Sequence, residues 1–350
     1  MTASPRIAID AMGGDVGPAV MLAGAAISRR RYPELHFTFF GDEAAIAPEL
    51  ARHKALADAV DIVHTAGVIA SDDKPSQAIR RSKDSSMGLA IAAVKAGEAQ
   101  AALSAGNTGA LMAIAKLALR TMPGIDRPAI AALLPTLAET DVVMLDLGAN
   151  TECDAGNLVQ FAVMGAAYAR TVQDIARPRV ALLNIGSEDM KGTGEVRDAA
   201  QRLRDAEALP LEFVGFIEAD RMSRGHVDVV VTDGFSGNIA LKSIEGTARF
   251  IADLIRNAFT SSWRSKAGFM LSRPAAMLLR KTLDPNNHNG GVFLGLSGLV
   301  VKSHGGADAN GVANAIGVAA KMIRADMIRR IADDLDNFRA DPAIVEDAAE

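Results

Sequence analysis

The segment VDVVVTDGFSGN, residues Val227–Asn238, shows the unit from which this chain is built: a strand, a glycine-containing loop and the start of a helix. Its first part, Val227–Val231, is apolar apart from Asp228, which predicts a buried strand of a parallel sheet. The unpaired backbone N–H groups at the start of the helix can bind an anion such as phosphate. An ordinary turn, in which Asp233 and Ser236 cap the helix, is the simpler explanation of this segment taken alone.

The same order of strand, loop and helix recurs along most of the chain. Further strands are expected at Arg6–Asp10, Leu35–Phe40, Val60–His64, Ala101–Leu103, Ala129–Leu134, Val142–Leu147, Val180–Ile185, Phe213–Ile217 and Gly290–Val301. This alternation predicts a doubly wound α/β fold, in which a largely parallel sheet has helices on both faces. The polar, glycine-rich segments follow strands, and ligands of such folds bind at the carboxyl ends of the strands. Near the C-terminus, Ala309–Asp336 is expected to form one long amphipathic helix.

The composition narrows the class of protein. The chain has 350 residues, of which 49% are hydrophobic, and a formal net charge of -5. A net acidic chain offers no general attraction for nucleic acid, so we expect no nucleic-acid partner. No apolar run is long enough to span a bilayer, and the N-terminus lacks the charged and apolar regions of a signal peptide. Cys153 is the only cysteine, which excludes an intrachain disulfide and fits a cytoplasmic location.

Two glycine-rich segments have features of phosphate-binding loops. After the first strand, Gly13 and Gly14 permit positive φ angles and a close approach of a ligand to the backbone. The pattern is not GxGxxG, so it predicts no dinucleotide cofactor. The second segment, Ser104–Gly109, repeats the SGN of residues 236–238 and adds neutral hydrogen-bond donors. Tight packing of a helix against a strand is the alternative explanation for both segments.

Three further side chains are candidates for chemistry. Lys191 lies among glycines and hydroxyl residues between a strand and a helix, where a mobile lysine can reach a phosphate; a solvated loop lysine is the alternative. His304 can act as a base, as a phosphate donor or as a helix cap. Cys153 has acidic neighbours, which raise the pKa of a thiol, so a structural role is favoured over a nucleophile. The six histidines are scattered and no metal-binding motif occurs, so we expect no metal.

Residues 259–283 differ in character from the rest of the chain. This segment contains the only tryptophan, Trp263, with apolar residues interleaved with cations and no acid. Its cations include Arg264, Lys266, Arg273, Arg280 and Lys281. A basic amphipathic helix predicts contact with an anionic membrane or with an acidic protein. A helix pair at a dimer interface is the alternative.

Six segments, taken together and in order, resemble the bacterial phosphate acyltransferase family, the PlsX-type acyl-ACP:phosphate acyltransferases. They are Ile9–Asp15, Ser104–Gly109, Asp146–Asn150, Asn184–Gly192, Thr232–Asn238 and Lys302–Asp308. The resemblance extends from Arg6 to about Asp336, and six ordered motifs are more specific than any one of them. It implies transfer of a fatty acyl group from acyl carrier protein to inorganic phosphate. The product is acyl phosphate for phospholipid synthesis, and no cofactor is implied.

The resemblance also implies how the protein is organised. The expected fold is similar to that of isocitrate and isopropylmalate dehydrogenases and of phosphotransacetylases, as a homodimer. Residues 1–340 would form a single catalytic α/β domain with residues 259–283 as an amphipathic helical insertion. Residues 341–350 would form a loose acidic tail. The protein would associate peripherally with the inner face of the cell membrane.

The same resemblance implies roles for individual residues. Lys191 would neutralise phosphate, Asn238 would donate to phosphate or to the thioester oxyanion, and His304 would orient phosphate. Substrate or phosphate contacts are expected from Asp10, Gly13, Gly14, Ser104, Gly106, Asn107, Thr108, Asp233, Ser236 and Gly237. Contacts with acyl carrier protein or membrane are expected from Trp263 and the cations of residues 259–283.

Two other functions fit the sequence. The first is a CoA-dependent phosphate acetyl- or butyryltransferase, which a comparison of short acyl-CoA with long acyl-ACP as substrates would distinguish. The second is a non-catalytic scaffold for a membrane or for acyl carrier protein. A scaffold would keep its function in a Lys191→Ala variant and lose it when Trp263 and its neighbours are disrupted.

Overall fold

The computed structural model describes residues 4–206 and 208–339, without the side chains of residues 279–283 and 285. The tail expected at residues 341–350 lies outside the described residues. The strands are β1 Arg6–Asp10, β2 His36–Gly41, β3 Val60–His64, β4 Ala101–Ser104, β5 Ala129–Leu134, β6 Val142–Leu145, β7 Arg179–Leu183, β8 Glu212–Ile217, β9 Val229–Val231, β10 Gly291–Leu294 and β11 Leu299–Lys302. The α-helices are α1 Gly17–Arg31, α2 Glu43–Leu50, α3 Pro75–Arg81, α4 Ser86–Lys95, α5 Thr108–Leu119, α6 Ala155–Val172, α7 Gly194–Asp205, α8 Gly234–Thr260, α9 Trp263–Leu283, α10 Ala309–Arg324 and α11 Met327–Arg339.

The strands of the described chain form one eleven-stranded sheet in the order β3-β2-β1-β4-β11-β10-β5-β6-β9-β7-β8. The first five strands of this order, β3, β2, β1, β4 and β11, are parallel to one another. The last four, β6, β9, β7 and β8, are also parallel to one another. The two parallel halves are joined by β10 and β5, which pair with their neighbours in antiparallel fashion. The largely parallel α/β fold predicted from the sequence is therefore confirmed.

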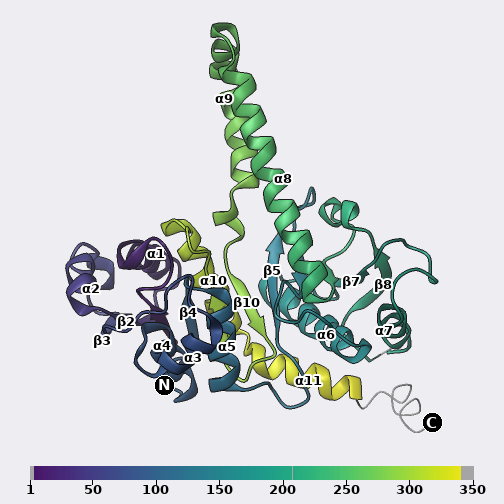
Figure 1. Cartoon of the computed structure of the whole chain (residues 1–350), viewed down its shortest axis with the longest axis horizontal. Helices are drawn as coiled ribbons and strands as arrows, with labels where there is room; N and C mark the ends of the chain where they lie inside the picture. Colours follow the sequence, from purple (N-terminus) through teal and green to yellow (C-terminus); the bar gives the residue numbers. More distant parts are fainter. Residues whose placement is uncertain (1–3, 207, 340–350) are drawn as a thin grey trace.

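Helices cover both faces of the sheet because each strand sends alternate side chains to opposite faces. In β4, Leu103 joins an apolar cluster with helices α1, α6, α10 and α11, whereas Ala102 joins a second cluster with α3, α4 and α5. The first cluster contains Tyr168 and Phe161 of α6, both fully buried. This layering places the helix N-termini that follow β1, β4 and β9 at the carboxyl edge of the sheet (Figure 1).

Two expectations about the C-terminal third are wrong. Residues 290–301 form the hairpin β10–β11 instead of one strand, and the turn uses Gly295 at φ +85. A Cβ on Gly295 would lie 2.9 Å from side-chain atoms of Ile125 and Met164, so packing and backbone both require glycine there. The long helix expected at 309–336 is broken into α10 and α11 at Asp326, which has φ +47. The break turns α11 against α6, where Ile331 and Leu335 are buried.

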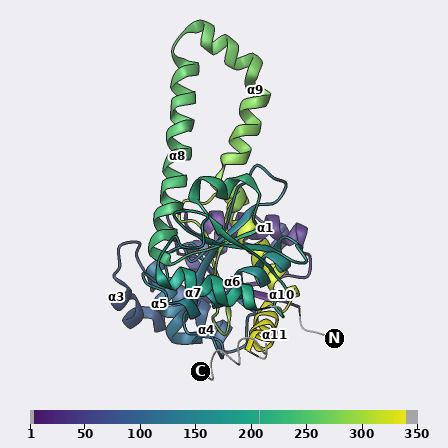
Figure 2. The same cartoon turned by 90° about the vertical axis from the view of Figure 1, so that its right-hand side faces the viewer.

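The helices α8 and α9 form an antiparallel hairpin that projects from the body (Figures 1 and 2). Helix α8 has 27 residues, which corresponds to about 40 Å, and only Gly234 and Gly237 at its start are buried. The outer ends of the two helices are joined by Phe259 and Phe269, whose ring centroids are 5.1 Å apart. Among the described residues, no helix is long and apolar enough to cross a membrane.

Candidate active site

A cavity of about 2240 Å³ lies where the hairpin meets the carboxyl edge of the sheet. Its floor comes from the loops that follow β1, β4, β6 and β11, and its walls from α8 and α9. Because β1, β4 and β11 are parallel neighbours, their loops meet at one place in the fold. The segments 12–15, 105–109 and 302–305, far apart in the sequence, therefore contribute to one site.

A buried carboxylate organises the floor of this cavity. Asp10 accepts hydrogen bonds from the Ser104 hydroxyl at 2.7 Å and from the Gly13 backbone N–H at 3.1 Å. The Ser104 oxygen in turn accepts from the Gly106 N–H at 3.0 Å. Burial raises the pKa of Asp10, while these donors act in the opposite direction. A Cβ on Gly13 would lie 2.4 Å from Asp10 Oδ2, so the turn requires glycine.

The structure divides the phosphate contacts expected in this region into two groups. Gly14, Gly106, Asn107 and Thr108 line the cavity. Asp10, Gly13 and Ser104 are not among the described lining residues, and their hydrogen bonds show that they hold the two loops together. In this structure these three residues brace the loops beside the cavity, and their direct contact with substrate stays a prediction.

Asn107 lines the cavity, but its side chain is already committed. Its Oδ1 accepts from the Ala110 N–H at 2.9 Å and so caps α5. Its Nδ2 donates to the Ser71 carbonyl at 2.7 Å. The amide therefore fixes the loop to the helix, and the first backbone N–H groups of α5, at Thr108 and Gly109, are further donors at this place. These groups lie at the positive end of the helix dipole.

The start of α8, the other predicted anion site, is already occupied by protein groups. Asp233 accepts from the Ser236 N–H at 2.8 Å, and the Gly237 N–H donates to the Asp233 carbonyl at 2.9 Å. A Cβ on Gly237 would lie 1.9 Å from the Asp146 carbonyl oxygen, so the helix start is packed against the loop after β6. Asp233, Ser236 and Gly237 are not among the described lining residues of the cavity. Their hydrogen bonds form the capped turn that was the simpler explanation of this segment, and their contact with phosphate stays a prediction.

Asn238 lies one step further along α8 and does line the cavity. Its side chain is exposed and faces Gly148, where a Cβ would lie 3.5 Å from the Asn238 Cβ. The loop beneath it is fixed by buried Asp146, which accepts from the backbone N–H groups of Ile130 and Asn150 at 2.9 and 2.7 Å. Asn238 is thus a neutral amide on a rigid support at the cavity wall.

Lys302 lines the cavity and is not among the candidate site residues predicted from the sequence. Its ammonium donates to the Ala105 carbonyl at 3.1 Å and to the Ser303 carbonyl. Burial lowers the pKa of Lys302 to about 8, helped by the charge of Lys242 and opposed by Asp10 and Asp15. An ammonium has three donors, so one remains beyond the two carbonyls. Its position was open to prediction from the sequence, because Lys302 begins the segment Lys302–Asp308, one of the six on which the family resemblance rests, at the end of an expected strand.

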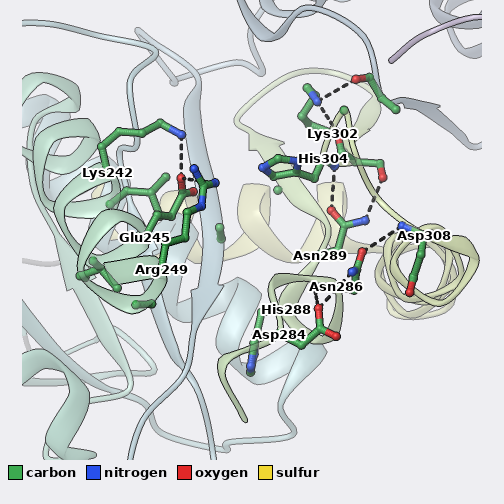
Figure 3. A pocket seen from close by; sticks show the side chains of 18 of the residues that line it. Lys242, Glu245, Arg249, Asp284, Asn286, His288, Asn289, Lys302, His304 and Asp308 are labelled. Atoms are coloured by element: carbon green, nitrogen blue, oxygen red, sulfur yellow. Dashed lines mark hydrogen bonds and ion pairs between the residues drawn. The ribbon is translucent and has the colours of Figure 1, made fainter. Parts of the chain in front are cut away.

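His304 follows Lys302 into the cavity (Figure 3). Its backbone N–H donates to Asn289 Oδ1 at 2.8 Å, which fixes the loop. Burial first, and then the charge of Lys302, lowers the pKa of the imidazole below its ordinary value. This shift favours the neutral imidazole, which can serve as a hydrogen-bond partner.

Charged side chains of α8 face Lys302 and His304 across the cavity (Figure 3). Lys242 forms an ion pair with Glu245 at 3.0 Å, and Arg249 approaches the same carboxylate at 3.8 Å. Two cations share one acid, so this group has a net positive charge. Sequence reasoning missed Lys242 and Arg249 as well, although their spacing from Glu245 places all three on one helix face.

Lys191 lies elsewhere in this structure. It is exposed in the loop after β7 and is not among the described lining residues. The loop is ordered by the Asn184 amide, which donates to the Lys191 carbonyl at 3.1 Å. Strands β7 and β9 are parallel neighbours, so the Lys191 loop leaves the sheet at the same edge as the segment leading to Asn238.

Cys153 agrees with the structural role expected from the sequence. It is half-buried, and burial together with the charges of Asp146 and Asp233 raises its pKa to about 12. A thiol with this pKa is not ionised at neutral pH and makes a poor nucleophile. The raised pKa therefore does not favour a covalent intermediate on Cys153.

The predicted membrane or carrier-protein contacts lie on the hairpin. Trp263 at its tip is 75% exposed, with the Arg264 guanidinium 5.3 Å from its ring centroid. Arg273 is also exposed, whereas Lys266 lines the cavity. The side chains of Arg280 and Lys281 lie outside the described part of the chain.

Comparisons with known proteins agree with this architecture. Residues 5–330 match the family described as fatty acid synthesis protein. A phosphate acyltransferase of Erythrobacter litoralis is 63% identical over 331 residues, covering 95% of this chain and 93% of that protein. A phosphate acyltransferase of Rhodospirillum rubrum is 52% identical over 345 residues, covering 99% and 98%.

Solved structures share the fold at much lower identity. A phosphotransacetylase from Streptococcus pyogenes has a TM-score of 0.59 and 17% identity, over 93% of this chain and 95% of that chain. The EutD phosphotransacetylase from Staphylococcus aureus has a TM-score of 0.57 and 15% identity, over 91% and 94%. At this identity the likeness concerns the fold alone.

Proposed function

The chain belongs to the phosphate acyltransferase family, and from this premise we propose that it transfers a fatty acyl group from acyl carrier protein to inorganic phosphate. A phosphate oxygen attacks the carbonyl carbon of the acyl thioester, and a C–O bond forms. The tetrahedral intermediate then collapses, the C–S bond breaks, and the carrier thiolate leaves and takes up the proton that the hydrogen phosphate ion gives up. The products are acyl phosphate, an activated acyl donor for phospholipid synthesis, and free acyl carrier protein.

The observation that carries this proposal is that one cavity joins a cationic end to an apolar end. At the cationic end, Lys302 and the start of α5 offer donors to phosphate. Toward the hairpin, the same cavity is lined by apolar side chains of α8 and α9. A site for a small anion and a long hydrocarbon needs this combination.

In the proposed mechanism, phosphate is already an anionic nucleophile, so positioning it against the thioester supplies much of the acceleration. Asn238 donates to the oxyanion that forms on the thioester oxygen, where a fixed amide stabilises developing charge. Neutral His304 orients phosphate beside Lys302. The thiolate is a good leaving group, so no strong general acid is required.

Lys191 is kept as a second candidate for the phosphate cation, because its loop leaves the sheet beside the strand that leads to Asn238. The two lysines make different predictions. If Lys302 alone holds phosphate, Lys302→Met raises the KM for phosphate and Lys191→Met does not. If the Lys191 loop closes on substrate, Lys191→Met lowers kcat as well.

The proposal is tested with purified protein, long-chain acyl-ACP and phosphate. Acyl phosphate is trapped with hydroxylamine as the hydroxamate, and free carrier thiol is measured in parallel. Equal amounts of both products are expected. Release of thiol without hydroxamate would indicate hydrolysis and refute phosphate as the acceptor.

The alternatives predict different substrates. A CoA-dependent phosphate acetyl- or butyryltransferase would turn over short acyl-CoA and ignore long acyl-ACP. The exposed apolar hairpin favours a lipid-linked substrate over a short acyl group. A non-catalytic scaffold would bind acyl carrier protein and give no product with either donor.

We also propose a homodimer that associates peripherally with anionic membranes from the cytoplasmic side. Trp263, Met270 and Leu271 near the hairpin tip are at least 75% exposed, and the Arg264 guanidinium lies over the Trp263 ring. An amphipathic tip of this kind suits the headgroup region of an anionic bilayer. Flotation with vesicles of anionic and of zwitterionic lipid tests the association, and light scattering after gel filtration tests the dimer.

A further inference from the structure

The inner face of α8 forms a continuous apolar stripe along the cavity. Its members recur every three or four residues, which places them on one side of the helix. They are Leu241, Ile244, Ala248, Ala252, Ile255 and Phe259. Across the cavity, α9 contributes Phe269, Ala275 and Ala276. The cavity therefore continues from the catalytic end into a cleft between the two helices, whose separation is visible in Figure 2.

The smallest side chains that line the middle of this cleft belong to alanines. Ala248 and Ala252 lie on α8, and Ala275 and Ala276 lie on α9, whereas larger side chains lie above and below them. Alanine leaves room between two helices that a larger side chain would fill. The stripe also begins directly beyond Asn238, the residue proposed to contact the thioester.

We infer that this cleft holds the acyl chain of the substrate, and that Ala248 and Ala252 determine how long a chain is accepted. The inference rests on the proposed function. Its occupant is a single hydrocarbon chain because the cleft is continuous with the site where the thioester must react. Net positive charge from Lys242 and Arg249 lies at the polar mouth of the cleft, where the phosphate and carrier end of the substrate belongs.

Helix geometry gives the distance of each alanine from the proposed thioester contact. Ala248 is ten residues and Ala252 fourteen residues beyond Asn238, which corresponds to about 15 and 21 Å along α8. An extended chain advances about 1.2 Å per bond, as an extended backbone does over the three bonds of a residue. A side chain at Ala248 therefore meets the acyl chain about one helical turn, or about five carbons, earlier than a side chain at Ala252.

The test uses one substitution at three positions of the same helix. Ala248→Phe and Ala252→Phe fill the cleft, and Ala258→Phe is the matched control, because Ala258 is exposed and does not line the cavity. The measured quantity is kcat/KM for acyl-ACP substrates from octanoyl to stearoyl. Thermal melting confirms that each variant is folded, and Ala252→Leu serves as a milder filling change if Ala252→Phe is not.

We expect a graded loss. Ala252→Phe keeps the octanoyl to lauroyl activities and loses at least tenfold with stearoyl, whereas Ala248→Phe shows the loss already at shorter chains. Each methylene that is excluded from the apolar cleft reduces kcat/KM by about fourfold. The Ala258→Phe profile follows the wild type.

Two results would overturn the inference. One is an unchanged chain-length profile in both cleft variants, and the other is an equal loss at every chain length. An unchanged profile together with a change in oligomeric state by light scattering would show that the cleft receives a second copy of the hairpin. If the wild type forms no acyl phosphate with any chain, the proposed function fails instead, so the two failures are distinguishable.

Discussion

Replacing Lys302 with methionine tests the assignment of the phosphate cation. A hydrogen bond to a charged group contributes about 1.5–3 kcal/mol. Loss of one such bond to phosphate should therefore lower kcat/KM for phosphate by about 10- to 150-fold. The effect should appear mainly in the KM for phosphate, because the acyl end of the site is untouched. Methionine has a similar length and no charge, so it keeps the packing of the lysine stem.

The pH dependence of kcat/KM for phosphate tests the role of Lys302 independently. Burial lowers the pKa of Lys302 from 10.5 to about 8, so the ammonium is present below that pH and is lost above it. Since kcat/KM reports the free enzyme, its value for phosphate should fall as pH rises through about 8. Lys302→Arg keeps its charge throughout this range and should abolish the alkaline fall, even if its geometry lowers the plateau.

The assay is acyl phosphate formation at saturating acyl-ACP, with phosphate varied from slightly acidic to alkaline pH. Thermal melting separates binding from folding. Because burial penalises the charged ammonium, Lys302→Met should not lower the melting temperature. An unchanged KM for phosphate in Lys302→Met, or the same alkaline fall in Lys302→Arg, would refute the role of Lys302.

Other residues yield further expectations. Asn238→Ala should lower kcat by about 10²- to 10³-fold if Asn238 stabilises the oxyanion, without a change in thermal melting; a kcat within twofold of wild type would move the oxyanion site elsewhere. Gly13→Ala should destabilise the fold by about 1–3 kcal/mol in urea unfolding, because its Cβ would lie 2.4 Å from Asp10 Oδ2 and 2.8 Å from the Gly106 nitrogen. Gly194→Ala, where a Cβ would meet nothing within 4 Å, is its control. Leu271→Asp should reduce flotation with anionic vesicles while leaving turnover of soluble acyl-ACP intact; unchanged flotation would separate the hairpin tip from membrane binding.

Strand and helix order could be predicted from the sequence because each element has its own local pattern. The strand at Val229–Val231 and the capped helix after Asp233 are examples, since apolar runs and capping residues act over a few positions. The division of residues 290–301 into two strands and of residues 309–336 into two helices was not predicted, also for local reasons. A single glycine at Gly295 and one left-handed residue at Asp326 interrupt patterns that otherwise continue.

The site was less predictable because it depends on strand order. Lys191 follows a strand, Lys302 is the last residue of one, and both lie near glycines, so local sequence does not separate them. Only the pairing of β11 with β4 places Lys302 beside the start of α5. Likewise, Asp10 and Ser104 have the residue types of a polar site, but their mutual hydrogen bond turns them toward each other. Which groups face a cavity is a property of the assembled sheet.

The central claim is that phosphate is the acceptor of a long acyl chain in this cavity. Its most direct test is mass spectrometry of the product formed from palmitoyl-ACP and oxygen-18-labelled phosphate by the purified protein. We predict palmitoyl phosphate that carries the labelled phosphoryl group, with one free carrier thiol for each product molecule. Unlabelled palmitate as the direct product, or turnover of acetyl-CoA with none of palmitoyl-ACP, would contradict the claim.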